Sequence, residues 1–275
     1  MIEIAVWCAG AIGLAILWGT GAEYWAGRRN RRRFPPPGRF LSAAGETVHV
    51  IEKGKAGPPV IFLAGLGNSA LAFSWIDEKV SSAARTYALD RPGLGWSARA
   101  RAPLTAEHSA DVVAAALDEL KIEEPVIVVA HSFGGVVSRV FASKYPGKVA
   151  GLVMIDSAHE EQLERFPFPV SVIARFMLFK NTLQKWRSYV GLMRLPGALH
   201  DQGHGLPERA QQAFYALLAT PKHRRAAASE AKNWRASRKA AMAARDFGSK
   251  PLYVLTADQW PQIMLPTWLE LQKEI

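Results

Sequence analysis

The segment from Val126 to Gly135 constrains the fold of this chain more than any other. An apolar run leads directly into Ala130-His-Ser-Phe-Gly134, and helix-compatible sequence follows. A serine with small residues two positions before and after it is typical of a tight strand-to-helix turn, because only small neighbours fit the strained backbone. Such a turn would lift the Ser132 hydroxyl to a helix N-terminus, where developing negative charge is favoured. The simpler interpretation is a serine that caps a helix after a buried strand.

Short apolar runs alternate with helical stretches from about Arg39 onward. Continuous apolar runs are typical of buried parallel strands, so the pattern predicts an α/β fold with a mostly parallel sheet and helices on both faces. Strands are expected at residues 48–51, 60–64, 86–89, 126–130, 152–155 and 252–256, with helices at 110–120 and 135–144. The region between the last two strands looks helical, notably at 210–218 and 226–244. It predicts a helical cap, inserted at about residues 158–248, over the edge of the sheet where ligands bind.

The N-terminal segment predicts a membrane anchor. Residues 4–22 carry no charge, and five arginines follow within residues 28–33. A helix of that length spans roughly 28 Å, close to the thickness of a bilayer core, and positive charge stays on the cytoplasmic side. We therefore expect a single-pass anchor at 1–27, a basic and proline-rich linker at 28–38, and a cytoplasmic domain at 39–275. A cleaved signal peptide is the alternative, but the segment lacks a basic stretch before its apolar run.

A glycine-bracketed loop follows the strand expected at 60–64. In this loop the Leu66 N–H can turn inward, and together with the Phe133 N–H it would form a two-donor hole for an oxyanion. The same residues, Gly65-Leu-Gly-Asn-Ser-Ala70, also match a dinucleotide-binding fingerprint with Asp90 twenty residues later. That alternative is disfavoured because a strand precedes the motif, a Pro- and Gly-rich loop rather than a helix follows Asp90, and Ser132 is left unexplained.

Four segments together resemble the α/β-hydrolase superfamily, over roughly residues 39–275. They are the loop at 64–67, Asp90-Arg-Pro-Gly-Leu-Gly-Trp-Ser97, Ala130-His-Ser-Phe-Gly-Gly135 and Gly151-Leu-Val-Met-Ile-Asp-Ser157. With its N-terminal segment, the chain looks like a membrane-anchored prokaryotic branch. The resemblance implies an α/β-hydrolase fold, hydrolysis of an ester or related acyl substrate by a Ser–His–acid triad, and no cofactor. A serine at the turn argues against dehalogenase and epoxide-hydrolase chemistry, which members of the superfamily perform with aspartate there. Two departures are Ala64, where histidine is usual, and Ala130, where glycine is usual.

The resemblance leaves two candidates for the triad acid. Asp258 follows the last expected strand, about two residues earlier than the usual spacing. Asp156 ends the preceding strand, a second position from which some members supply the acid. The simpler interpretation is a cap or hydrogen bond to local backbone for Asp156 and the start of a turn for Asp258.

No histidine occupies the place of the family's base, which lies some 25–30 residues past the acid. The chain ends at Ile275, and no histidine follows His223. We therefore expect a C-terminally truncated domain that lacks its last strand and helix, with impaired activity. Among the histidines present, His131 is expected to pack within the turn, and His159 is the best substitute base because it follows the end of a strand.

The charge pattern and the spacing of possible metal ligands do not predict a further binding partner. His200 and His204 are spaced as a metal pair, but Gly203 and Gly205 favour a loop, so no metal site is expected. A single cysteine, Cys8, excludes an intrachain disulfide. The formal charge of +10 includes a basic stretch of the cap, in which Glu230 is the one acid. Its basic members are Lys222, Arg224, Arg225, Lys232, Arg235, Arg238 and Lys239.

A solvated face is the default interpretation of that stretch, contact with anionic lipid is the sharper one, and nucleic acid is not expected. The sequence thus predicts a membrane-bound serine hydrolase for a small apolar acyl substrate. The alternatives are a non-catalytic member that binds an apolar ligand or a partner, and a cofactor-free peroxidase-like activity on the same triad.

Overall fold

A computed structural model of the chain describes residues 1–199, 203 and 205–275. Its centre is a seven-stranded sheet with the order β1-β2-β4-β3-β5-β6-β7. The two neighbours β1–β2 and β2–β4 pair antiparallel, and all other neighbours pair parallel. The strands are β1 (Arg39–Ala43), β2 (Glu46–Lys53), β3 (Pro59–Leu63), β4 (Arg85–Asp90), β5 (Val126–His131), β6 (Val149–Ile155) and β7 (Leu252–Leu255).

The six strands expected from apolar runs correspond to β2–β7. The additional strand is β1, whose short sequence Arg-Phe-Leu-Ser-Ala has only two buried residues. It forms because Ala44 and Gly45 adopt positive φ angles and turn the chain back into β2. A strand that is stabilised mainly by its turn and its partner leaves little apolar signal in the sequence.

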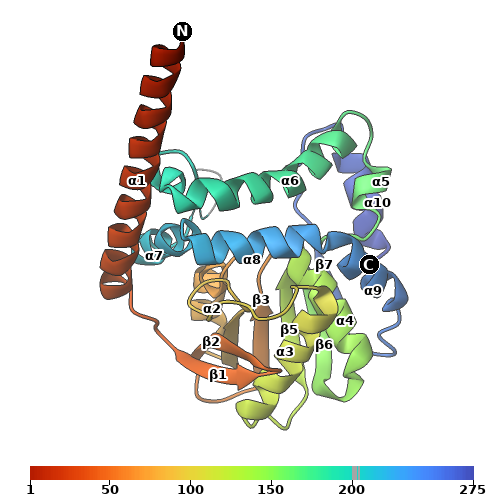
Figure 1. Cartoon of the computed structure of the whole chain (residues 1–275). Coiled ribbons are helices and arrows are strands. Elements are labelled where there is room, and N and C mark those ends of the chain that lie inside the picture. Colours follow the sequence, from red (N-terminus) through yellow and green to blue (C-terminus); the bar gives the residue numbers. More distant parts are fainter. Residues whose placement is uncertain (200–202, 204) are drawn as a thin grey trace.

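Helices cover both faces of the sheet, as predicted (Figure 1). Alternate strand residues such as Ile61 and Val128 face a core shared with α3 (Ala106–Glu119) and α4 (Phe133–Lys144). Their neighbours Phe62 and Val129 face a second core, shared with the 3-10 helix η1 (Ala70–Phe73) and α7 (Glu208–Leu218), next to α2 (Ser74–Val80). The short η2 (Pro146–Lys148) leads into β6.

The cap lies between β6 and β7 and is helical, as expected. It comprises α5 (Gln162–Arg165), α6 (Val170–Tyr189), η3 (Leu192–Arg194), α7, α8 (Pro221–Lys232) and α9 (Trp234–Ala243). The single helix expected at 226–244 is two helices, because Asn233 interrupts the helical backbone. In Figure 1, α8 lies over the ends of the strands and α6 forms the outermost layer above α8.

The N-terminal helix α1 runs from Ile2 to Arg33. By length and composition it could cross a membrane, since its apolar window has a mean hydropathy of 1.7 and none of that window is buried. The predicted linker at 28–38 needs correction, because the helix continues through the arginine run. Only the proline-rich residues 34–38 leave the helix before β1.

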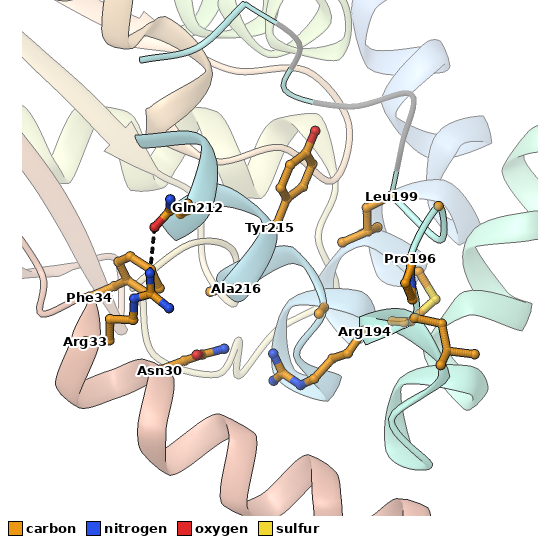
Figure 2. Close-up of a pocket in the computed structure, with 13 residues that line it drawn as sticks. Asn30, Arg33, Phe34, Arg194, Pro196, Leu199, Gln212, Tyr215 and Ala216 are labelled. Atoms are coloured by element: carbon orange, nitrogen blue, oxygen red, sulfur yellow. Dashed lines mark hydrogen bonds between the residues drawn. The ribbon is translucent and has the colours of Figure 1, made fainter. Parts of the chain in front are cut away.

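The second half of α1 packs against the cap. Glu23 is buried and forms an ion pair with Arg194, with an N–O distance of 2.6 Å. Arg33 donates a hydrogen bond to Gln212 of α7 beside a cavity of about 440 Å³ (Figure 2). These contacts fix the direction in which the apolar half of α1 leaves the domain.

The sheet ends at β7, whose outer side chains Tyr253 and Leu255 are exposed. The chain then turns back toward the cap, where α10 (Leu265–Lys273) places Trp268 against Phe166. This helix covers the cap rather than the sheet.

Candidate active site

Ser132 occupies a sharp turn between β5 and α4, as the sequence predicts. Its φ of 50° and ψ of −120° lie in a region that L-residues rarely adopt. A side chain at Gly134 would collide with the carbonyl of Leu63, and one at Gly135 would collide with Ser157. The glycines therefore allow the helix to start close against β3, while the fully buried Ala130 shows that a methyl group fits two positions before the serine.

Ser132 lies in the wall of a cavity of about 450 Å³ beneath the cap. Leu66 and Phe133 line the same cavity. The rest of the lining is mostly apolar and comes from the cap and from the region after β7, and it includes Leu163, Phe166, Ile173, Met177, Trp234 and Trp260. A cavity of this size with few polar groups suits a small, mainly apolar ligand.

The loop after β3 packs directly on the serine turn. A methyl group at Gly65 would lie 3.0 Å from His131 Nδ1 and 3.3 Å from Ser132 Cβ. Within the part of the chain that the structure describes, neither the Leu66 N–H nor the Phe133 N–H has a hydrogen-bond acceptor. The structure thus places Ser132 and two residues whose N–H groups lack a described acceptor in the wall of a single cavity.

A buried ion pair between the sheet and the cap holds this loop. Arg91 donates from Nε to Glu230 Oε1 at 2.7 Å, and both side chains are almost completely buried. Its Nη atoms donate to the carbonyls of Ala64 and Gly65, while Glu230 Oε2 accepts from the Gly67 N–H at 2.7 Å. The pair thus binds three backbone groups on either side of Leu66.

This ion pair was not predicted from the sequence. The feature that could have indicated it is Glu230, the one acidic residue in a basic stretch of the cap. The interpretation of that basic stretch as a solvated face is wrong for three of its residues. Glu230 and Arg224 are buried, and Arg224 donates to the Leu218 carbonyl. Lys222 donates to the Gly95 carbonyl. Burial lowers the pKa of Lys222 to about 8. Arg225, Lys232, Arg235 and Lys239 are exposed.

The two candidate acids have different surroundings. Asp156 follows β6 with a φ of 45°, and the carbonyl of the preceding Ile155 accepts from the Ser132 N–H at 3.3 Å. Asp156 Oδ1 accepts hydrogen bonds from the Trp268 indole at 2.8 Å and the Trp260 indole at 3.3 Å. Asp258 is exposed. Of the two, Asp156 is the one next to the serine turn.

Among the described residues that line the Ser132 cavity there is no histidine. His131 lies beside Gly65, and burial lowers its pKa while the Asp156 carboxylate acts in the opposite direction. His159 is buried under the cap, where its Nδ1 accepts from the Glu161 N–H and burial lowers its pKa. It does not line the cavity. His200 and His204 lie outside the described residues.

Asp90 has an internal role rather than that of a nucleotide ligand. Its Oδ1 accepts from the Ala70 N–H at 2.8 Å, and its Oδ2 lies 3.0 Å from both the Trp96 N–H and His49 Nδ1. These bonds tie the loops after β3 and β4 together. The carboxylate that the dinucleotide alternative assigns to a ribose is thus occupied by protein groups.

The burial of His223 leads us to predict that the protein is less stable in mild acid. It is completely buried, its Nδ1 accepts from the Gly95 N–H at 3.0 Å, and its Nε2 donates to the Gly67 carbonyl at 2.8 Å. A second proton would face the Gly95 N–H, and burial also opposes the charge, so the pKa of His223 lies well below 6.5. As the pH falls below about 6.5, the unfolded chain binds a proton that the folded chain refuses, and the free energy of unfolding falls by up to about 1.4 kcal/mol per pH unit.

Urea unfolding in detergent at pH values from 7.5 down to 5 measures this slope. In His223→Phe the slope should be smaller, whatever the loss of stability at neutral pH. An unchanged slope would contradict the assignment to His223.

Comparison with known proteins gives the family. The family model described as alpha/beta hydrolase fold matches residues 58–258. The chain is 32% identical over 131 residues to 2-hydroxymuconate semialdehyde hydrolase of Pseudomonas sp. (strain CF600), covering 45% of this chain and 44% of that protein. It is 26% identical over 168 residues to cis-3-alkyl-4-alkyloxetan-2-one decarboxylase of Shewanella oneidensis, covering 57% and 52%.

Among solved structures, a thermophilic esterase from Thermogutta terrifontis is similar with a TM-score of 0.61, at 20% identity and over 86% of each chain. The chain spans 20%, 42% and 52% of the length of three curated relatives that it matches. The matched family model covers the sheet from β3 onward, the serine turn and the cap. On this match, together with the mixed sheet and the strand-to-helix serine turn, the chain belongs to the α/β hydrolase fold family.

Proposed function

We propose that the protein is a membrane-anchored serine hydrolase that cleaves an ester or related acyl substrate with Ser132 as nucleophile. The observation that carries this proposal is the strained turn, which puts Ser132 in the wall of an apolar cavity that Leu66 and Phe133 also line. A hydrolase among the similar curated proteins supports the reaction class. Aspartate-based dehalogenation does not suit a serine at this position.

The reaction begins with attack of Ser132 Oγ on the carbonyl carbon. A C–O bond forms, the carbonyl π electrons move to oxygen, and the serine proton passes to a base. The Leu66 and Phe133 N–H groups donate to the oxyanion. When this intermediate collapses, the alcohol leaves with a proton, and water then releases the acid from the acyl-enzyme.

Asp156 is our choice for the acid, because it follows the strand next to the serine turn and the Asp258 side chain is exposed. Its two indole donors hold the carboxylate in place. Since no described histidine lines the cavity, serine-dependent turnover is expected to be slow. A non-catalytic member that binds an acyl ligand is the second candidate, and it is favoured because no histidine is found among the described residues of the cavity wall.

The apolar half of α1 supplies the anchor in this proposal. The arginine run at the end of α1 supports a cytoplasmic hydrolase domain, because positive charge stays on the cytoplasmic side of a membrane. Glu23, the first charged residue after the apolar stretch, is held by Arg194 of the cap, so the domain sits directly against the membrane surface.

A fluorophosphonate tests the role of Ser132. Attack forms a bond between Ser132 Oγ and phosphorus, fluoride leaves, and the serine proton goes to solvent. We expect slow labelling of the full chain in detergent, mapped by mass spectrometry to the peptide that contains Ser132. Ser132→Ala should abolish the label, and Ser82→Ala, which removes an exposed serine, should not change it. A label that survives in Ser132→Ala would refute the assignment.

A further inference from the structure

The outer face of α6 is apolar and exposed. Five side chains on one side of the helix, at a spacing of three or four residues, are between 48% and 62% exposed: Val172, Phe176, Phe179, Leu183 and Trp186. A spacing of this kind places them on one stripe. The opposite side faces the protein, where Val170, Ala174 and Leu178 line the Ser132 cavity. Further along this side, Gln184 accepts from buried Arg224 at 3.0 Å and Ser188 is buried. The helix therefore leaves one apolar stripe exposed on the side away from the domain.

This face looks toward the side on which α1 leaves the domain. In Figure 1, α6 runs across α1, α8 and the sheet lie on one side of α6, and the N-terminal half of α1 extends beyond it on the other. The level at which the two helices meet is fixed by close packing, because a side chain at Gly19 would collide with the carbonyl of Val190. It is fixed again by the ion pair of Glu23 with Arg194. Gly19 and Glu23 bracket the end of the uncharged stretch, which is where a spanning helix reaches the membrane surface.

The charge around this face suits an anionic surface. From residue 166 to residue 199 the chain has no aspartate or glutamate and five basic residues. Arg194 is paired with Glu23, which leaves Arg175, Lys180, Lys185 and Arg187 as the positive charges along α6. Aromatic rings lie at the same level, with Trp18 exposed on α1 and Lys185 lying over the ring of exposed Trp186. Apolar side chains bordered by basic ones, with tryptophan at the boundary, are typical of helices that lie in the interface of an anionic bilayer.

The Ser132 cavity opens beside this face. Ile173 and Met177 line the cavity and are themselves about half exposed next to the stripe. An acyl chain in the outer part of the bilayer would thus meet the cavity mouth without crossing water.

We propose that the outer face of α6 lies on an anionic bilayer and that the Ser132 cavity takes membrane-dissolved acyl substrates from that bilayer. The proposal rests on the proposed anchoring by α1 and on Ser132 as nucleophile. It adds the contact surface of the cap and the class of substrate.

Site-specific labels test the contact with the full chain in phosphatidylcholine vesicles that contain phosphatidylglycerol. An environment-sensitive fluorophore on Cys8, the one cysteine, reports on α1, and the same fluorophore in Cys8→Ser/Phe179→Cys reports on α6. Lipids with a nitroxide near the headgroup should quench the label at position 179. In the matched control Cys8→Ser/Lys55→Cys, the label sits on an exposed loop at the opposite edge of the sheet and should not be quenched. Replacing phosphatidylglycerol with phosphatidylcholine should weaken the quenching at position 179.

The outcomes separate this proposal from the anchor. Nitroxides deep in the bilayer should quench the label on Cys8. If they do and the label at position 179 stays bright, α1 is inserted but α6 does not touch the bilayer, and the proposal fails. A Cys8 label that is not quenched overturns the anchor and this proposal together.

Two fluorophosphonates test the source of the substrate. One carries a long alkyl chain that dissolves in the vesicles, and the other is short and water-soluble. Phe176→Ser/Phe179→Ser should slow the labelling of Ser132 by the long probe at least about tenfold, because two rings no longer enter the lipid, and change the rate for the short probe by less than about twofold. The matched control Tyr253→Ser/Leu255→Ser removes two exposed apolar side chains from β7 and should leave both rates unchanged. Equal slowing of both probes would overturn the proposal, whereas absence of any Ser132 label would overturn the nucleophile assignment instead.

Discussion

Glu230→Gln lowers the free energy of unfolding by about 3–5 kcal/mol, because it leaves the Arg91 guanidinium buried without a counter-charge. The Arg91 side chain is 1% exposed, and it binds the Glu230 carboxylate and the carbonyls of Ala64 and Gly65. The substitution keeps the size of the side chain, so little of the loss comes from packing. Urea unfolding of the full chain in detergent measures the difference.

The control is a pair of the same chemistry at the surface. Arg39 and Glu52 lie 2.5 Å apart in an exposed position, so Glu52→Gln should change the free energy of unfolding by less than about 1 kcal/mol. Glu230→Gln should also slow fluorophosphonate labelling of Ser132, since Glu230 holds the Gly67 N–H next to Leu66. If Glu230→Gln destabilises no more than Glu52→Gln, the ion pair does not hold the loop in the way described.

Imidazole added to the solution should raise Ser132-dependent ester hydrolysis at least about tenfold. A positioned general base contributes roughly 10²–10⁴-fold, and the cavity of about 450 Å³ holds Ser132 without a described histidine in its wall. Neutral imidazole can enter a space of this size and accept the serine proton. The measurement is the hydrolysis rate of a p-nitrophenyl ester at increasing imidazole concentration, corrected for the reaction without protein.

Ser132→Ala should lose the imidazole-dependent rate completely, which separates catalysis by the serine from simple proximity in the cavity. His131→Gln and His159→Ala test the two nearest alternatives for an internal base. Fast turnover without imidazole that disappears in one of these variants would identify that histidine as the base and contradict the prediction. A rate that responds to imidazole equally in the wild-type chain and in Ser132→Ala would favour the non-catalytic alternative.

Some features of the candidate site could be predicted from local sequence patterns, and others could not. The serine turn was predictable because its requirements are local: small residues around Ser132 after an apolar strand are needed to form the turn itself. The position of Leu66 beside it was predictable because both residues follow parallel strands, and the carboxyl ends of parallel strands meet at one edge of the sheet. The surroundings of Asp156 and Asp258 were not predictable, because both residues follow strands, and only packing shows that Asp156 accepts from two indoles while Asp258 is exposed.

The sequence by itself determined the α/β class, six of the strands, the helical cap and the serine turn, since each follows from the periodicity of apolar residues or from small residues at a turn. It did not reveal that Glu230 and Arg91 are partners, because 139 residues separate them and neither has a local pattern that reports burial. It also did not reveal that α6 turns its apolar stripe outward, because both sides of that helix carry apolar residues. Tertiary structure decided these points, since burial of a charge or a helix face depends on which distant segments pack against it.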